Sequence, residues 1–328
     1  MTIKYDNVFI NDTALITGPY EAKGLLGKYF DKSYDDLYFG EDTWEQAESK
    51  LIVDSVELLL EKSGLNKIDI DVMISGDLLN QITASNYAAK DFPFPFIGIY
   101  AACATSTLGM AMAANMVSTK MASNVICTVS SHNNAAEKQF RYPVEYGGPK
   151  PKSATFTSTG AAGVLISDKK SKIRIESSTV GSVVDSMIND VFNMGAVMAP
   201  AAAETIYKHF LDTGRNSDYY DLILTGDLGV YGKKILTDYI KGEYGISLSN
   251  YEDTGTLLYD LNKQPVYAGG SGPACLPLVV YGYIFEQMKK GKLRKVLLVA
   301  TGALMSQTTA NQRMTIPSIA HAISLEVA

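Results

Sequence analysis

Apolar residues recur every three or four positions between residues 43 and 62, which is the period of a helix with one buried face. Thr43 and Gln46 have the spacing of a capping box at the start of that helix. Short, nearly continuous apolar runs at 71–77 and 124–131 predict buried strands. Because such strands alternate with helical segments, the pattern favours parallel strand pairing with helices on the faces of the sheet.

One cysteine lies between a strand pattern and a helix pattern. Cys103 follows the aromatic and β-branched run 94–100 and precedes the small, apolar run 106–117. Unpaired backbone N–H groups at a helix N-terminus favour a thiolate over a thiol, so the position is typical of a nucleophile. The alternative is that Cys103 is one more small buried residue.

A long segment interrupts this alternation. Residues 132–159 are polar, aromatic and punctuated by proline and glycine, and a loop of this length in a compact domain is more often functional or interfacial than idle. The apolar runs 159–167 and 172–180 then predict a pair of strands that closes the first half of the chain.

The second half of the chain repeats the first. Residues 221–228 restate the pattern of 71–78, and residues 295–302 restate that of 124–131. Between them, the turn 267–275 precedes an apolar helix as the Cys103 turn does. Repeats in the same order indicate two copies of one α/β unit, and we predict an N-terminal half at 1–180 and a C-terminal half at 181–328 whose equivalent strand ends face a common cleft.

Composition narrows the function classes. The 328 residues are 46% hydrophobic and 20% charged, as in an ordinary globular protein, and the net charge of −6 argues against a nucleic-acid partner bound by general electrostatics. The N-terminus lacks the apolar core of a signal peptide, and no apolar run reaches the ~20 residues that span a bilayer, so we expect a soluble protein. The three cysteines have no zinc-type spacing, and neither a metal nor a cofactor is expected.

These motifs resemble those of the thiolase superfamily, including the ketoacyl synthases, over most of the chain. Residues 101–104 are similar to the nucleophile turn of type III ketoacyl synthases, 159–165 to their glycine-rich strand, and 269–278 to their Gly-Asn-Thr-Ser-type turn. The resemblance implies a thiolase-like fold, with two similar α/β halves in a five-layered αβαβα arrangement. It also implies a homodimer, since superfamily members usually pair through a strand of the first half.

The histidine and asparagine that assist the cysteine in ketoacyl synthases are absent from the matching turns of this chain. The family's histidine would fall at Asp227, where a carboxylate would oppose an enolate, and its asparagine would fall at Gly270. His209 and His321 are expected to be ordinary helix or surface residues. We therefore predict no catalytic residues and a vestigial nucleophile at Cys103. The alternative is an active ketoacyl synthase or acyltransferase that uses Cys103 as acyl acceptor.

Within the superfamily the chain resembles the stage V sporulation protein AD family, notably at 18–30, 130–148 and 225–229. That resemblance implies binding of dipicolinic acid (pyridine-2,6-dicarboxylate) for its uptake into the developing spore as part of a SpoVA-type transport complex. It also implies membrane subunits of that complex as partners and a peripheral place at the spore inner membrane. A purely structural subunit of a membrane assembly is a third possibility.

Dipicolinate is a flat dianion, so its site needs a plane for the ring and cations or N–H donors for the carboxylates. Backbone N–H groups at the start of the Cys103 helix and in the turn 269–272 are candidates, as is Arg141 with Phe140 or Tyr142 beside it. Alternatively, Arg141 is an interface salt-bridge partner and His132 only caps its loop. Asp227 would repel the free dianion and is a candidate contact for its calcium chelate. The predicted ligand-binding residues are Cys103, His132, Asn133, Arg141, Tyr142, Asp227, Gly270 and Ser271.

Overall fold

The predicted amphipathic helix is confirmed as α2 (Trp44–Ser63) in the computed structural model, which describes residues 1–141 and 148–328. The Thr43 side chain accepts a hydrogen bond from the backbone N–H of Gln46, which caps the first turn. The helix ends at Gly64, whose φ of 68° is the left-handed conformation that glycine adopts readily. The face that includes Leu51 and Ile52 is fully buried against the sheet of the first half.

Five neighbouring strands from the N-terminal part of the chain form one half of the main sheet. Their spatial order is β5 (Phe96–Gly98), β4 (Val72–Gly76), β6 (Asn124–Ser131), β8 (Gly160–Ser167) and β2 (Phe9–Thr17). The pairs of β4 with β5 and with β6 are parallel, whereas β8 is antiparallel to both of its neighbours, β6 and β2. The predicted parallel pairing therefore holds for the part of the sheet that carries the cysteine turn.

The other half of the sheet repeats this topology strand for strand, with four strands from beyond residue 180 and β9 from just before it. The order is β12 (Tyr251–Asp253), β11 (Leu222–Thr225), β14 (Lys295–Ala303), β15 (Pro317–Val327) and β9 (Ile173–Val180). Again the first three strands are parallel, and β15 is antiparallel to both β14 and β9. The repeated segments recognised in the sequence occupy equivalent places, since β4 corresponds to β11 and β6 to β14.

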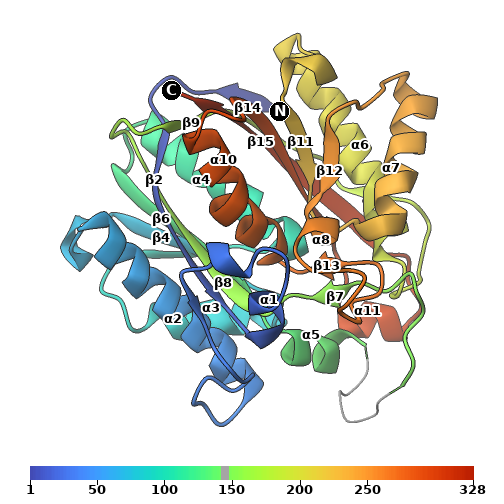
Figure 1. Cartoon of the computed structure of the whole chain (residues 1–328), viewed down its shortest axis with the longest axis horizontal. Coiled ribbons are helices and arrows are strands. Elements are labelled where there is room, and N and C mark those ends of the chain that lie inside the picture. Colours follow the sequence, from blue (N-terminus) through green and yellow to red (C-terminus); the bar gives the residue numbers. More distant parts are fainter. Residues whose placement is uncertain (142–147) are drawn as a thin grey trace.

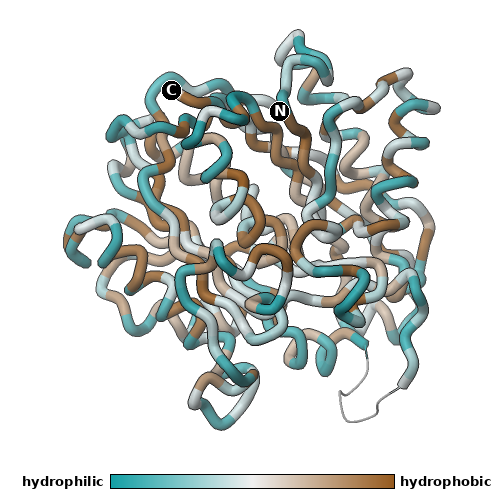
Figure 2. Tube along the Cα trace, in the orientation of Figure 1, coloured by the Kyte–Doolittle hydropathy of each residue, from teal (hydrophilic) through white to brown (hydrophobic). Residues whose placement is uncertain are grey.

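Helices separate and cover the two halves of the sheet in five layers (Figure 1). Between them lie α4 (Thr105–Ser118) and the π-helical segment η7 (Leu278–Ile284), which continues into α10 (Phe285–Lys289). The outer face of the first half is covered by α2 and α3 (Thr83–Ala89), and that of the second by α6 (Met194–Thr213) and α7 (Gly229–Tyr244). Figure 2 shows hydrophobic residues along the strands and enclosed helices and hydrophilic ones in the peripheral turns. The predicted thiolase-like fold class is thus confirmed.

One strand prediction was wrong. Strand β9 does not pair with β8 to close the first half; it pairs with β15 along most of its length and meets β2 only at Phe9 and Ile10. The short β1 (Thr2–Lys4) also pairs with β9. Local strand propensity located the strand correctly but could not identify its partner, which is distant in sequence. The domain boundary at residue 180 stays a prediction.

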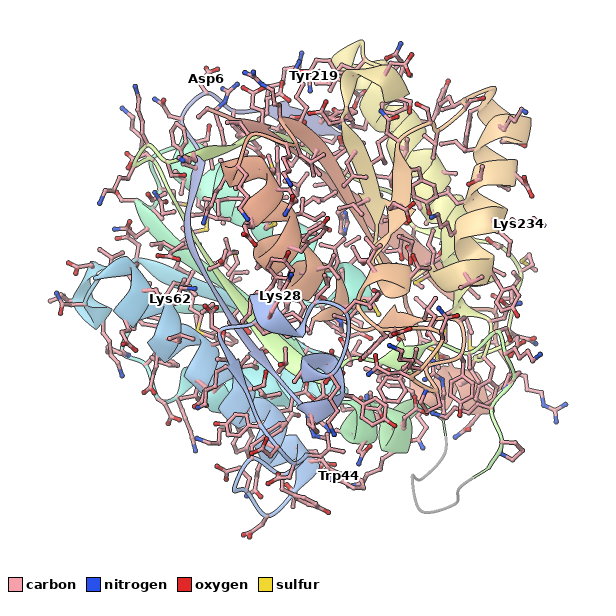
Figure 3. The ribbon with its side chains drawn as sticks, in the orientation of Figure 1. Asp6, Lys28, Trp44, Lys62, Tyr219 and Lys234 are labelled. Carbon is pink, nitrogen blue, oxygen red and sulfur yellow. The ribbon has the colours of Figure 1, made fainter. Side chains whose placement is uncertain are left out.

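Short elements complete the chain. The strands are β3 (Lys32–Ser33), β7 (Phe156–Thr157), β10 (Val184–Asp185) and β13 (Gly270–Ser271). The short helices are α1 (Pro19–Ala22), α5 (Asn133–Phe140), α8 (Thr254–Leu257), α9 (Cys275–Pro277) and α11 (Gln307–Asn311), and the 3-10 turns are η1 (Gly27–Tyr29), η2 (Lys67–Asp69), η3 (Asn80–Ile82), η4 (Ala102–Ala104) and η6 (Ser217–Tyr219). Charged side chains such as Asp6, Lys62 and Lys234 lie at the periphery (Figure 3). None of the helices in the described ranges is long and apolar enough to cross a membrane.

Candidate functional site

The cysteine turn is held in place by close contact with the other half. Cys103 lies in η4, between β5 and α4, and is half-buried. The preceding Ala102 has a φ of 47°, a left-handed conformation that costs energy for a residue with a side chain. Gly302 at the end of β14 packs against this turn, and a Cβ there would lie 2.2 Å from the Ala101 carbonyl oxygen. Only glycine allows the two backbones to approach this closely, so β14 packs directly against the cysteine turn.

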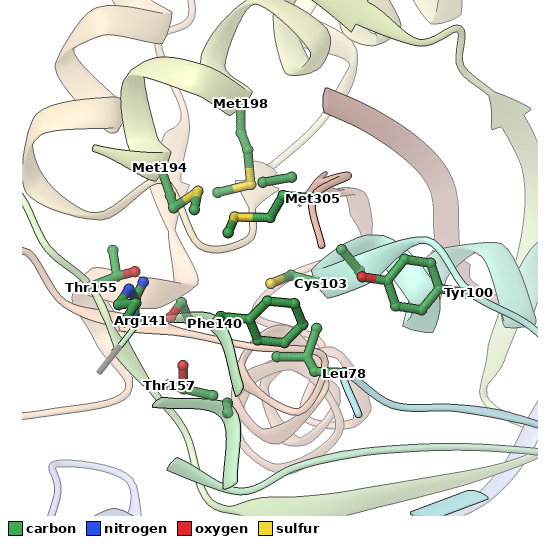
Figure 4. A pocket seen from close by; sticks show the side chains of 14 residues that line it. Leu78, Tyr100, Cys103, Phe140, Arg141, Thr155, Thr157, Met194, Met198 and Met305 are labelled. Atoms are coloured by element: carbon green, nitrogen blue, oxygen red, sulfur yellow. The ribbon is translucent and has the colours of Figure 1, made fainter. Parts of the chain in front are cut away.

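Cys103 opens into a small pocket of about 60 Å³. Figure 4 shows three methionines, Met194, Met198 and Met305, along one side of the Cys103 side chain. Leu78, Tyr100 and Phe140 contribute further apolar surface. The polar lining consists of Arg141, Thr155, Thr157, Ser271 and Cys103 itself. The pocket therefore has an apolar wall and a polar wall, supplied by segments from both halves of the chain.

Arg141 is a cation held in a fixed orientation at this pocket. Its guanidinium forms an ion pair with Glu137, and its Nε donates to the Val191 carbonyl oxygen at 3.5 Å. The guanidinium carbon lies 6.0 Å from the centre of the Phe192 ring. Arg141 thus lines the pocket and forms an ion pair within its own chain, while its predicted ligand contact and its alternative role in an interface salt bridge stay predictions.

Asp227 lies behind the cysteine turn and not in the pocket wall. Its Oδ2 accepts a hydrogen bond from the Gly272 N–H at 2.8 Å, and its side chain is 1% exposed. Burial raises the pKa of Asp227 well above its ordinary value, and the nearby Asp253 carboxylate raises it further. Burial and the neighbouring acid therefore both favour the uncharged form of this carboxyl.

The thiolate expected at Cys103 is contradicted by its surroundings. Burial raises the pKa of the Cys103 thiol well above its ordinary value, and the Asp227 carboxyl raises it further, while Arg141 lowers it only in part. The N-terminal dipole of α4 was the sequence argument for a thiolate, but loss of solvent and a neighbouring acid outweigh it. Cys103 is a thiol in a cleft.

The turn 269–272 offers less to a ligand than predicted. Gly270 is buried, and a Cβ at this position would lie 3.0 Å from Tyr259 Cε2 and 3.1 Å from Cys275 Sγ, so the family's asparagine would not fit without a shift. The N–H of Gly272 is bonded to Asp227, and that of Gly269 to the Val266 carbonyl oxygen. Only Ser271 of the predicted turn residues lines the pocket.

His132 and Asn133 do not line the pocket. His132 is fully buried, caps α5 through the Ala135 N–H, and contacts the Leu37 carbonyl oxygen at 2.8 Å through Nε2. Burial lowers its pKa to about 4. Asn133 donates from Nδ2 to the Thr157 carbonyl oxygen at 3.0 Å. The capping alternative therefore describes His132 correctly, and Tyr142 lies outside the described residues.

The other two histidines are also engaged elsewhere. His209 bonds with the Thr179 hydroxyl at 2.7 Å and with the Tyr220 hydroxyl at 2.6 Å. His321 accepts from the Gly181 N–H at 3.3 Å. Both are buried, which lowers each pKa to about 4. His209 lies in α6, as expected of an ordinary helix residue, whereas His321 lies in β15 and is neither a helix nor a surface residue. None of the three histidines is among the described residues that line the pocket beside Cys103.

Sequence reasoning missed the methionine wall and Thr155. Met194 and Met198 are one helical turn apart on α6, a spacing that equally describes an ordinary buried helix face. Met305 follows β14, and Thr155 precedes β7. Because these residues come from three separate segments, no local pattern could have grouped them.

Known structures share this fold at low sequence identity. The 3-oxoacyl-[acyl-carrier-protein] synthase III of Aquifex aeolicus is 12% identical, with a TM-score of 0.60 over 97% of this chain and 99% of that one. A variant of OleA from Xanthomonas campestris is 13% identical, with a TM-score of 0.63 over 99% of both chains. These likenesses establish the fold alone.

Sequence similarity establishes the family. Residues 1–326 match the family model described as stage V sporulation protein AD (SpoVAD). The stage V sporulation protein AD of Bacillus subtilis (strain 168) is 46% identical over 319 residues, which cover 97% of this chain and 94% of that protein. The chain therefore belongs to the stage V sporulation protein AD family, built on a thiolase-like fold.

Proposed function

We propose that the protein binds dipicolinic acid in the pocket beside Cys103, for uptake of that acid into the developing spore as part of a SpoVA-type transport complex. The observation that carries the proposal is the fixed Arg141 guanidinium in the polar wall of a pocket whose opposite wall is apolar. A guanidinium can meet a carboxylate with two parallel hydrogen bonds, while Phe140 and the methionines provide surface for a flat ring.

The same site argues against condensation chemistry. A condensing enzyme needs an ionisable cysteine with donors that stabilise the enolate and the oxyanion. Here Cys103 is held as a thiol, the family's histidine position is the buried Asp227, and an asparagine at Gly270 would not fit without a shift of its neighbours. The proposed role of Cys103 is therefore part of the floor of a binding pocket, with no cofactor.

The proposed partners follow from the family. A complex of this kind would join the protein to membrane subunits and hold it peripherally at the spore inner membrane. A homodimer formed through β5, the edge strand of the first half, is part of the proposal, as is the absence of a nucleic-acid partner.

Calorimetric titration of the purified protein with dipicolinate tests the proposal. We expect saturable heat with the wild type and a roughly tenfold to hundredfold weaker affinity in Arg141→Met, because a charged hydrogen bond contributes about 1.5–3 kcal/mol. Lys234→Met is the control, since it also removes one positive charge but lies exposed on α7. Absence of heat at millimolar ligand, or equal loss in both variants, would refute the proposal.

The alternative function is an acyltransferase that uses Cys103 as acyl acceptor, and it is favoured by the place of this thiol in the pocket. It predicts a mass increase on incubation with an acyl-CoA that disappears in Cys103→Ser. On the binding proposal no such adduct forms, and intact-protein mass spectrometry separates the two functions.

A further inference from the structure

Two turns that are distant in sequence carry a concentration of positive charge. Residues 168–172, between β8 and β9, and residues 289–295, from the end of α10 to the start of β14, together contain eight Lys or Arg and one acid. The chain as a whole has a net charge of −6. Cations gathered so densely in an acidic chain create a local positive potential that the rest of the surface does not share.

The fold brings these two turns to one edge of the molecule. The backbone N–H of Ala328 donates to the Lys172 carbonyl oxygen at 3.0 Å, and that of Val327 donates to the Arg294 carbonyl oxygen at 2.9 Å. The end of β15 therefore lies between the two turns. Figure 1 shows both chain ends at this edge.

Most of these cations have no ionic partner in the chain. Lys290 pairs with Glu286. Asp221 accepts hydrogen bonds from the backbone N–H groups of Arg294 and Lys295. Within residues 1–141 and 148–328 no ion pair engages the exposed cations that we call the basic edge, which are Lys169, Lys170, Lys172, Lys289, Lys292 and Arg294. The charge of the basic edge is therefore open to an external partner.

The repeat within the chain shows that the fold does not require these cations. The turn 118–124 joins α4 to β6 as the turn 289–295 joins α10 to β14, yet it contains a single cation, Lys120. Asp71 and Asp221 hold the two turns in the same way, each by hydrogen bonds from two successive backbone N–H groups. The same connection is thus made with one cation or with five, so the additional charge points to a role other than folding.

An exposed apolar side chain lies beside the basic edge. Met121 is 75% exposed and follows Lys120 in the turn before β6. Asn124 at the start of β6 pairs with Ser167 at the end of β8, so this turn lies next to the first turn of the basic edge. An exposed methionine among lysines is typical of surfaces that attach to membranes, where the apolar group enters the headgroup region and the cations meet anionic lipid.

We propose that the basic edge binds the headgroups of an anionic lipid bilayer and that Met121 enters the bilayer surface beside it. The inference rests on the peripheral membrane place in the proposed function, and it names the surface that makes the contact. The basic edge has five lysines and one arginine. A lysine ammonium is a point charge that suits mobile headgroups, whereas arginine suits a carboxylate held in a fixed, bidentate geometry. This composition favours a lipid surface over an acidic protein.

In this arrangement the pocket beside Cys103 lies far from the bilayer. Strand β14 begins at Lys295 in the second basic turn, and Met305, which lines the pocket, follows its other end. Nine residues at about 3.3 Å each separate the two places by roughly 30 Å. Changes at the basic edge should therefore leave dipicolinate binding unaffected, and the two properties can be tested separately.

Vesicle sedimentation tests the proposal, with vesicles of phosphatidylcholine alone and of phosphatidylcholine mixed with phosphatidylglycerol. We expect the wild type to bind only the anionic vesicles, and less tightly as salt rises. Lys170→Glu/Lys292→Glu should bind them at least tenfold less tightly, because each cation near an anionic surface contributes roughly a fivefold gain in affinity. Lys234→Glu/Lys241→Glu on α7 makes the same change of charge at exposed positions and should stay within about twofold of the wild type.

Equal binding to both kinds of vesicle, or an equal loss in the two double variants, would overturn the inference. Binding of the wild type to immobilised polyglutamate but not to vesicles would assign the basic edge to an acidic protein and overturn it too. Calorimetry with dipicolinate on the same preparations keeps the proposed function separate. Heat without vesicle binding would refute the inference alone, and vesicle binding without heat would refute the dipicolinate site alone.

The methionine contact has its own pair of variants. Met121→Gln should weaken binding to the anionic vesicles roughly threefold to tenfold, because the apolar side chain no longer gains from leaving water. Met187→Gln is the control, since Met187 is 77% exposed but follows β10, which pairs with β15 at Pro317, the end of β15 remote from the basic edge. Equal effects of the two variants, or none in Met121→Gln, would exclude Met121 from the membrane contact.

Discussion

The two halves share one topology, yet their cysteine turns differ in how deeply the cysteine is buried. In the first half, Cys103 is half-buried and opens into the pocket. In the second, Cys275 is fully buried, and Gly270 packs against it and Tyr259. The duplicated scaffold thus has two equivalent turns, of which close packing buries the second, whereas the first opens into a pocket.

Each cysteine turn also packs against the end of a central strand of the other half. Gly302 at the end of β14 approaches the backbone of Ala101, and Ser131 at the end of β6 lies against Gly272, where a Cβ would be 2.7 Å from the serine Oγ. Ser131 and Gly302 occupy equivalent places in the two halves. At the Ser131 contact the glycine, Gly272, belongs to the turn, whereas at the other contact the glycine, Gly302, belongs to the strand.

The aspartates that follow β4 and β11, Asp77 and Asp227, also differ between the two halves, in the hydrogen bonds that they accept. Asp77 accepts hydrogen bonds on both oxygens, from the N–H groups of Leu79 and Ser85, each at 2.8 Å. Asp227 accepts one from Gly272, and its Oδ1 has no hydrogen-bond partner within the described residues. The acid of the first half is a structural cap, whereas that of the second half is buried beside Cys103 and Cys275.

Replacing Gly302 by serine, the residue at the equivalent position 131 of the first half, should have the largest effect on stability. Gly302→Ser would place a Cβ 2.2 Å from the Ala101 carbonyl oxygen, and we expect a loss of about 3 kcal/mol or more in the free energy of unfolding, since backbone has to move. Gly242→Ser on α7, where a Cβ would meet nothing within 4 Å, is the control and should stay within ~0.5 kcal/mol of the wild type. Urea unfolding measures both, and equal stability of the two variants would show that the turn does not depend on this contact.

The link between the halves should depend on pH. Glu21 of the first half accepts hydrogen bonds from the Tyr259 hydroxyl of the second and from the Thr159 N–H, and burial raises its pKa to about 7. Because the folded pKa exceeds the ordinary 4.5, the folded state binds the proton more tightly, and this contribution to stability falls as pH rises from about 4.5 to 7. The wild type should lose about 2–3 kcal/mol more between pH 5 and pH 8 than Glu21→Gln. Parallel stability curves for the two proteins would contradict this assignment.

Removing one oxygen from each acid should give the smallest effect. Asp77→Asn replaces one of two bonded acceptors by an amide donor, so we expect it to cost about 1–3 kcal/mol of unfolding free energy. Asp227→Asn can keep the Gly272 bond through its amide oxygen and should cost less than ~1 kcal/mol. Chemical denaturation of the two variants side by side tests the difference. A larger cost at Asp227 would mean that the two acids play equivalent structural roles.

Sequence reasoning selected three residues that the structure brings together in one pocket, and their role in ligand binding stays a prediction. Cys103, Arg141 and Ser271 line the pocket as predicted, since each belongs to a turn or loop next to a strand that the pattern located. His132 and Asn133 follow β6 too, but their side chains turn inward to satisfy backbone groups of buried segments. Which way a side chain turns depends on neighbours that are distant in sequence, so spacing alone could not separate these cases.

The sequence by itself determined the duplicated α/β plan, the cysteine turn and the missing histidine and asparagine, because periodicity, repeats and motifs are local and survive in the linear chain. The tertiary structure alone decided that Cys103 is a thiol, that a side chain at Gly270 would require its neighbours to shift, and that three methionines line one pocket with Arg141 and Thr155. Burial, pKa and pocket shape depend on which segments meet in space, and that is settled only when the two halves pack together.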